Sequence, residues 1–278
     1  MAKVMVLPDI EPMNPAVGAI ASGLDLREPL EPETVLAVRA AVLEHGVVFF
    51  RGQDLTRDQM LAFMVNFGTP CIDPISVAQG PVPAEATIGN LPTRSYAPAT
   101  AVWHFDSSLA PTPASLMALR AVEVPPVGGD TCWASMYAAY DALSEPMRNM
   151  LDGLTALHSA YKVLPLMAGS ADGLLQEDLT AIHPVVRVHP ETGRKALFAN
   201  ELWTERIVEL STAESDALLA FLFEHVKSPE FSIRWHWRQH DLAFWDNRSF
   251  SHHAINDYTA NRVMQKSLLA GDRPYGPS

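Results

Sequence analysis

The stretch VWHFDSS, residues 102–108, contains a His-x-Asp pair formed by His104 and Asp106. In an extended strand side chains alternate between the two faces, so residues two apart point the same way. The pair therefore presents an imidazole and a carboxylate to one point in space. Two histidines with one carboxylate are a ligand set that both Fe(II) and Zn(II) accept. The pair alone does not establish a metal site, because the chain holds 10 His and 32 Asp and Glu residues.

A third ligand is available near the C-terminus, in the stretch FWDNRSFSHHAINDY at 244–258. His252 and His253 are adjacent there, so in an extended chain they face opposite ways and only one of them can join the site. If the preceding strand ends near Arg248, the two histidines lie in the connection that leads to the final strand.

The remaining histidines are given ordinary roles. His189 forms a His-x-Glu pair with Glu191, but the tight turn at 190–193 is expected to point these side chains to solvent. Five others are predicted to be structural or surface residues: His45, His158, His225, His236 and His240.

The bulk composition restricts the class of protein. A chain of 278 residues is long enough for one domain with a well-buried core, and we expect a single domain over 1–278. The net charge of −12 argues against a nucleic-acid partner, which requires clustered Lys and Arg. No apolar run is long enough to predict a membrane span, and two cysteines fit a reducing cytoplasm.

Hydrophobic periodicity predicts few helices and many strands. Helices are expected at 32–46, 56–68, 136–154 and 211–228. Strands are expected within 47–52, 115–126, 128–135, 185–200, 231–238, 242–248 and 261–272. Strands at such short spacing, joined by hairpins, indicate a mainly β or α+β protein. The expected architecture is a β-sandwich or jelly roll with helices packed outside.

Residues 69–101 differ from the rest of the chain. They hold six prolines and few periodic apolar positions. A stretch of this length without regular structure is usually functional or mobile in a compact domain. Because it directly precedes His104, we expect it to form a lid over the site.

Four motifs in order, WHFD, GGDT, WDNRSFSHHA and NRVMQKS, resemble the taurine dioxygenase and 2,4-dichlorophenoxyacetate dioxygenase family of Fe(II)/2-oxoglutarate-dependent oxygenases. The resemblance covers most of the chain. It implies a double-stranded β-helix, or jelly roll, with the iron at one open end. It also implies that 2-oxoglutarate and O2 are consumed, a small organic substrate is oxidised, and succinate and CO2 are released.

The resemblance assigns roles to particular residues. It implies that His104, Asp106 and His252 hold the iron, since the family's distal histidine stands five residues after the Asn of WDN. It further implies that Arg262 and Thr131 bind the distal carboxylate of 2-oxoglutarate. The planar fork of an arginine suits that task because it can hold a carboxylate with two parallel hydrogen bonds.

The residues expected to contact the substrate depart from the taurine-type pattern. Lys266 stands where such members have a second arginine, while Asp73 and Ser76 take the places of a His and a Tyr. Thr100 replaces an Asn, and Asn200 is retained and expected to line the pocket. An Asp near a sulfonate is unfavourable by like charge, so taurine is an unlikely substrate. Lys266 favours another anion, such as an aryloxyalkanoate or a sulfate ester.

Two other functions compete with the oxygenase. A Zn(II) hydrolase could use the same three ligands, but it would have no need for Arg262 and Thr131. A binding jelly roll without catalysis would be expected to have lost a ligand. The subunit count is open, and the resemblance allows a homodimer or a homotetramer.

Overall fold

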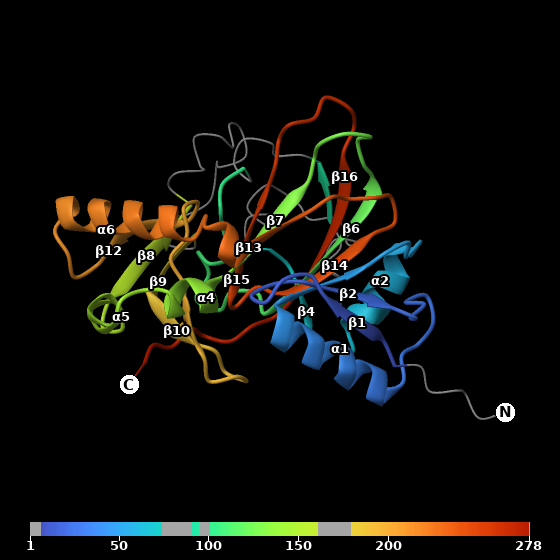
Figure 1. Cartoon of the computed structure of the whole chain (residues 1–278), viewed down its shortest axis with the longest axis horizontal. Coiled ribbons are helices and arrows are strands. Elements are labelled where there is room, and N and C mark those ends of the chain that lie inside the picture. The colour runs from blue at the N-terminus through green and yellow to red at the C-terminus, as the bar shows by residue number, and fades with distance from the viewer. Residues whose placement is uncertain (1–6, 74–90, 95–100, 161–178, 278) are drawn as a thin grey trace.

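The computed structural model describes residues 7–73, 91–94, 101–160 and 179–277. Most of the predicted lid at 69–101 lies outside the described residues, as do Ser76 and Thr100. Within the described ranges, no helix combines the length and the apolar character needed to cross a membrane. The chain is mostly β-structure with few helices (Figure 1).

Eight strands form the largest sheet. Seven follow one path, and the eighth, β5, pairs with β16. Neighbours are antiparallel except for β2 and β3. In path order, with β5 last, the strands are β1 (Asp9–Pro12), β2 (Ala19–Ser22), β3 (Val47–Phe50), β14 (Leu242–Asp246), β6 (Leu116–Glu123), β16 (Val263–Leu269), β4 (Pro70–Cys71) and β5 (Leu91–Arg94).

A second sheet packs against one face of the first. It has the order β13 (Ser232–Trp235), β7 (Thr131–Ser135) and β15 (Phe250–Ala254). Aromatic side chains fill the space between the two sheets. Phe49 stacks on Trp235 with ring centroids 3.9 Å apart, and Trp133 meets Trp245 edge-on at 5.7 Å. This packing places the inward faces of β7 and β15 opposite the large sheet that contains β16, and several predicted site residues lie there.

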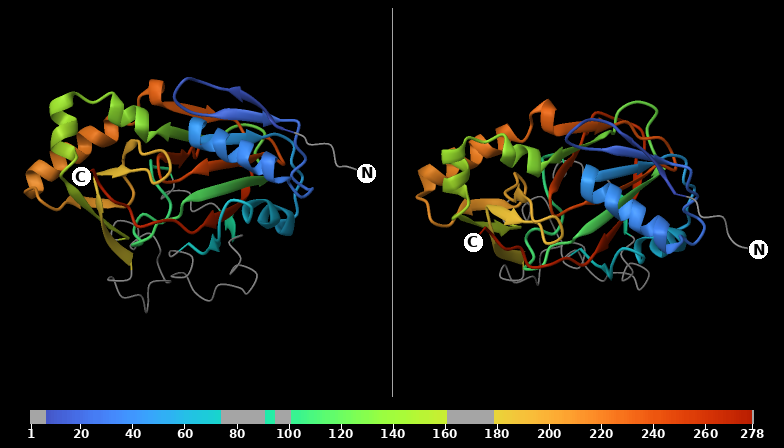
Figure 2. Two further views of the ribbon diagram at one scale, coloured as in Figure 1. Left: turned by 90° about the horizontal axis from the view of Figure 1, so that it is seen from below. Right: turned by 60° about the horizontal axis from the view of Figure 1, so that its bottom comes forward.

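Two helices cover the outer face of the large sheet, α1 (Pro32–His45) and α2 (Arg57–Met64) (Figures 1 and 2). Side chains alternate along the strands, so Val48 and Phe50 enter this outer core while Phe49 enters the inner one. Both predicted helices are confirmed. The second ends earlier than expected, because Asn66 Nδ2 donates to the carbonyls of Ala62 and Phe63.

The remaining elements gather at the opposite end of the molecule from α1 and α2, as Figures 1 and 2 show for α5 and α6. The predicted helix at 136–154 is two helices, and the predicted hairpin at 185–200 and helix at 211–228 are confirmed. These elements are α4 (Met136–Asp141), α5 (Glu145–Leu151), β8 (Thr155–Ser159), β9 (Thr180–Pro184), β10 (Val186–Val188), β11 (Lys195–Leu197), β12 (Thr204–Ile207), α6 (Thr212–His225) and a 3-10 turn at Pro229–Phe231.

The placement of His252 and His253 corrects one expectation. They lie within strand β15, not in a connection before the final strand. Strand β14 ends at Asp246, the chain turns at 247–249, and it then pairs with β7 of the other sheet. The sequence pattern did not separate this strand from β14, because only the short turn at 247–249 lies between them. The chain changes from one sheet to the other within that turn.

Candidate active site

His104 and His252 are brought together by backbone pairing. Each residue's N–H donates to the other's carbonyl at 2.9 Å, which forms an isolated antiparallel bridge. Directly opposed residues of an antiparallel pair point to the same face. The two rings accordingly lie 4.3 Å apart between centroids. Two segments that are far apart in the sequence therefore present imidazoles side by side.

Asp106 is fixed by Asn247, in the turn that follows β14. Asn247 Oδ1 accepts the backbone N–H of Asp106 at 3.1 Å, and its Nδ2 donates to the carbonyls of Asp106 and Ala114, each at 3.0 Å. The next residue, Ser107, has φ of 61°, in the left-handed region. In the sequence, Asn247 serves only to locate the distal histidine of the motif. The structure shows that its side chain also holds the His-x-Asp segment in place.

The donor atoms suit a divalent metal. Those of His104, Asp106 and His252 all lie within 4.8 Å of one another, and the three side chains are buried. His104 Nδ1 donates to the carbonyl of Val102 at 2.8 Å, which leaves its Nε2 lone pair for a metal. Ligating histidines ordinarily donate their other ring N–H in this way. His252 Nε2 lies 3.5 Å from an Asp106 carboxylate oxygen.

Protonation states also favour ligation. Burial, helped by the neighbouring His252, lowers the pKa of His104 to about 3, so its imidazole is neutral at pH 7. Burial alone would raise the pKa of Asp106, but the Lys266 ammonium and His252 outweigh it and hold that pKa far below its usual range. Neutral imidazole and ionised carboxylate are the forms that bind metals.

Lys266 reaches the same cluster from β16. Its Nζ lies 2.8 Å from Asp73 Oδ2 and 3.1 Å from Asp106 Oδ1. Burial opposes the charge of Lys266, yet Asp106 and Asp73 raise its pKa above the ordinary lysine value. Of the five residues predicted to contact substrate, Lys266 thus contacts the predicted metal ligand Asp106, and Asp73 pairs with Lys266.

Arg262 and Thr131 also meet. Arg262 Nη2 donates to Thr131 Oγ1 at 3.2 Å, and its Nε donates to the carbonyl of Gly129 at 2.9 Å. Gly129 has φ of 73°, and a Cβ there would lie 3.1 Å from Arg262 Cδ and 2.9 Å from Pro125. The glycine lets the arginine stem lie against the turn. Burial lowers the pKa of Arg262, partly offset by Tyr258 and Asp130.

Comparison with known proteins is consistent with this arrangement. The family model described as taurine catabolism dioxygenase TauD, TfdA family, matches residues 9–268. The chain belongs to the TauD/TfdA family.

Individual relatives of this TauD/TfdA protein match over nearly its whole length. An alpha-ketoglutarate-dependent sulfate ester dioxygenase of Pseudomonas putida is 35% identical, covering 96% of this chain and 91% of the relative. An (S)-phenoxypropionate/alpha-ketoglutarate-dioxygenase of Sphingobium herbicidovorans is 33% identical, covering 95% of each. The crystal structure of AAD-2 in complex with Mn(II) and N-oxalylglycine is 32% identical with a TM-score of 0.82, covering 96% of this chain and 98% of that one.

The protein is therefore a dioxygenase that depends on 2-oxoglutarate and O2. The alternatives of a zinc hydrolase and of a binding jelly roll without catalysis are not retained.

Asn200 of the TauD/TfdA protein lies in a buried polar network. Its Oδ1 accepts the backbone N–H of Trp203 at 2.9 Å, and its Nδ2 donates to Ser108 Oγ at 3.1 Å. Ser108 Oγ also lies 3.1 Å from His158 Nδ1. Asn200 thus holds the segment that follows Asp106. Its contact with substrate stays a prediction.

His189 corrects the expectation that it points to solvent. It is fully buried, and its Nε2 donates to Asp246 Oδ2 at 3.0 Å. Its Nδ1 accepts the backbone N–H groups of Glu191 and Thr192. The ring therefore folds under the turn and ties it to the end of β14, a contact between distant segments that the local sequence does not reveal.

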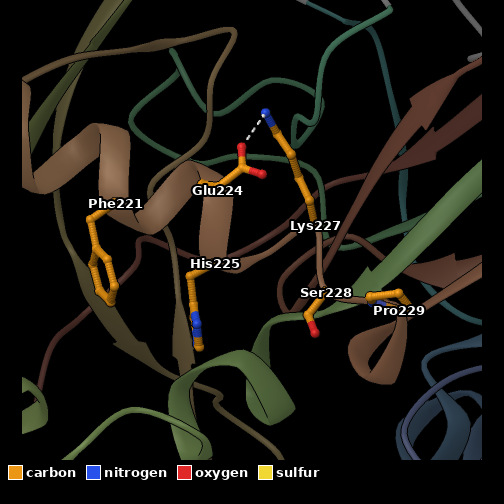
Figure 3. Close-up of a pocket in the computed structure, with 6 residues that line it drawn as sticks. All are labelled: Phe221, Glu224, His225, Lys227, Ser228 and Pro229. Atoms are coloured by element: carbon orange, nitrogen blue, oxygen red, sulfur yellow. Dashed lines mark ion pairs between the residues drawn. The ribbon is translucent and has the colours of Figure 1, made fainter.

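A surface hollow of about 470 Å³ lies at the end of α6 and is not lined by any predicted site residue (Figure 3). Phe221 and His225 stack with ring centroids 5.8 Å apart, and His225 Nε2 donates to the carbonyl of Ala139. Lys227 pairs with Glu224 at 3.2 Å. The polar side chains His225, Lys227 and Glu224 already have partners within the protein. We therefore assign no function to the hollow.

Proposed function

We propose that this dioxygenase binds Fe(II) through His104, Asp106 and His252 and hydroxylates a small anionic substrate, with release of succinate and CO2. The buried His-Asp-His cluster carries the proposal, because these ligands on one face of a metal leave its other positions open. When bound, the iron supplies the redox chemistry, while the protein binds and orients the reactants. The AAD-2 complex with Mn(II) supports a divalent metal here.

Arg262 and Thr131 are proposed to bind the distal carboxylate of 2-oxoglutarate. Support comes from their contact with each other and from the burial of Thr131, which is 1% exposed. A half-buried guanidinium strengthens a hydrogen-bonded pair with a carboxylate, because less water competes for it. The remaining N–H groups of Arg262 are the donors for that pair.

We further infer a double-stranded β-helix that makes up a single domain over 1–278. The inference is supported by two mainly antiparallel sheets that pack face to face, with the site residues on their inward faces. Support also comes from the family match over residues 9–268. In this arrangement the two sheets exclude water from the site on both sides.

The substrate is proposed to carry a carboxylate or a sulfate ester group, held by Lys266. An ammonium has three N–H donors, and Asp73 and Asp106 use two of them. A metal on Asp106 would weaken that residue's hold on Lys266, so the ammonium could then receive an anion. The relatives named for sulfate ester and phenoxypropionate substrates support this class.

The test is an anaerobic visible spectrum of the metal-free protein after addition of Fe(II) and 2-oxoglutarate. A charge-transfer band that requires both additions is expected. Tight Zn(II) binding without such a band would contradict the proposal. An alkyl sulfate, an aryloxyalkanoate and taurine are then added separately, and one of the first two is expected to shift the band. That shift should be lost in Lys266→Met and kept in Lys195→Met, whose lysine pairs with Asp152 at the surface.

A further inference from the structure

We propose that Trp237 is a positioning residue for 2-oxoglutarate: its indole N–H fixes the Thr131 hydroxyl as a donor toward the cosubstrate carboxylate. The inference rests on the proposed 2-oxoglutarate site at Thr131 and Arg262. Trp237 follows β13 and was not singled out in the sequence, where a tryptophan beside strands resembles any core residue.

Hydrogen-bond counting carries the first step. A threonine hydroxyl has one donor hydrogen and two acceptor lone pairs. Trp237 Nε1 lies 2.9 Å from Thr131 Oγ1, and Arg262 Nη2 lies 3.2 Å from the same atom. Indole and guanidinium groups can only donate. Both lone pairs are therefore used, and the hydroxyl hydrogen is left to be donated to a third group.

Burial makes this arrangement rigid. Thr131 is 1% exposed and Trp237 is 3% exposed, so water does not compete for the contact. The Trp237 ring packs against Trp133, with centroids 6.1 Å apart, and Trp133 lies on the same strand as Thr131. Among the described residues, the Thr131 hydroxyl has no hydrogen-bond acceptor for its hydrogen. An anionic carboxylate beside Arg262 would supply that acceptor.

Without the indole N–H, one lone pair of Thr131 would be free and the hydroxyl could rotate away from the carboxylate. Trp237 therefore acts through Thr131 and not by touching 2-oxoglutarate. This distinction makes the inference testable, because the effect of removing the indole should depend on the presence of the threonine hydroxyl.

The experiment measures 2-oxoglutarate binding by calorimetry to the Mn(II)-loaded enzyme under anaerobic conditions. Since a neutral hydrogen bond contributes modestly, Trp237→Phe is expected to weaken binding about 3- to 10-fold. Thr131→Val removes a hydrogen bond to a charged group and should weaken binding about 10-fold or more. In the Thr131→Val background, Trp237→Phe should cause no further loss. A further loss there would overturn the inference, because it would show that Trp237 acts independently of Thr131.

Trp235→Phe is the matched control. Trp235 lies two residues earlier and is equally buried, but its indole N–H has no partner among the described residues. Its replacement should leave 2-oxoglutarate affinity unchanged, and an equal loss at both tryptophans would assign the effect to packing and overturn the inference. In steady-state assays, Trp237→Phe should raise the KM for 2-oxoglutarate and change kcat little.

Two further measurements separate the possible failures. If Arg262→Met leaves 2-oxoglutarate affinity unchanged, the proposed cosubstrate site itself is wrong. If Arg262→Met weakens binding and Trp237→Phe does not, only the role of Trp237 fails. Should Trp237→Phe not fold, the wild-type protein gives a second readout. In its Zn(II) form, the ¹⁵N-indole resonance of Trp237 should shift on addition of 2-oxoglutarate, and no shift would overturn the inference.

Discussion

At the scale of single residues, the site depends on which side of a strand each side chain occupies. His252 and His253 are neighbours, yet His252 faces Trp133 and Trp245 in the inner core, with ring centroids at 6.4 and 5.1 Å. His253 instead contacts Trp103, at 4.8 Å. The alternation of side chains along β15 therefore separates a candidate ligand from a residue with the same chemistry.

His252→Ala is expected to abolish turnover and to remove tight Fe(II) binding, because only two of the three proposed ligands remain. His253→Ala is the matched control and should keep measurable turnover. Calorimetry of metal binding, together with succinate formation, measures both variants. The reverse pattern would show that the ligand assignment is wrong.

A second residue-scale prediction concerns pH. Burial lowers the pKa of His183 from 6.5 to about 4, while its Nε2 donates to the carbonyls of Ser108 and Ala110. Between these two pH values the unfolded chain binds more protons than the folded one, so stability falls as pH falls from 6.5 to 4. The loss from this residue is about 3 kcal/mol over that window.

Urea unfolding at several pH values checks this expectation. His183→Gln keeps an N–H donor but cannot titrate, so the stability of this variant should depend less steeply on pH between 6.5 and 4. Other buried histidines contribute to both proteins and cancel in the comparison. Identical slopes would rule out His183 as a source of the acid sensitivity.

At the scale of elements, local patterns predicted the helices and eight of the sixteen described strands. The Thr56 capping box and the C-cap glycine at Gly46 mark their helices within a few residues, so α1 and α2 were predictable. Strand β15 was not, because the turn before it moves the chain from one sheet to the other. The Trp237 contact was also hidden, since its partner Thr131 is 106 residues away.

Gly46 connects α1 to β3 and supports a prediction about this junction. Its φ is 78°, and a Cβ there would lie 2.0 Å from the Phe250 ring. Gly46→Ala should therefore destabilise the protein by about 2 kcal/mol or more, through strain and overpacking. Gly153→Ala is the control, since nothing lies within 4 Å of its added Cβ. Urea unfolding compares the two, and equal small effects would contradict the tight junction.

At the scale of the whole molecule, the site joins the two sheets. His252 and Thr131 belong to the smaller sheet, whereas Lys266 belongs to the larger one and Arg262 directly precedes its strand. The resemblance to family motifs predicted that these residues belong to the site. The contact between Lys266 and Asp106 joins residues 160 apart in the sequence, so local spacing could not predict it. We therefore expect ligands of the proposed site to contact both sheets.

Ligand binding is expected to raise the unfolding temperature in two steps. Mn(II) should give one increment and N-oxalylglycine a second, each corresponding to about 3 kcal/mol at a hundredfold excess over its Kd. Arg262→Met should keep the first increment and lose most of the second. Differential scanning calorimetry measures both. A variant that keeps the full second increment would place the cosubstrate carboxylate elsewhere.

The ammonium of Lys266 has one more consequence. A buried carboxylate without a counter-charge is costly, and a protein that depends on a metal for that charge is held together less well before the metal arrives. Here the chain carries its own counter-ion, since Lys266 Nζ already lies 3.1 Å from Asp106. We therefore expect the newly made polypeptide to close its core before any metal binds, because the Lys266 ammonium already balances the charge of Asp106.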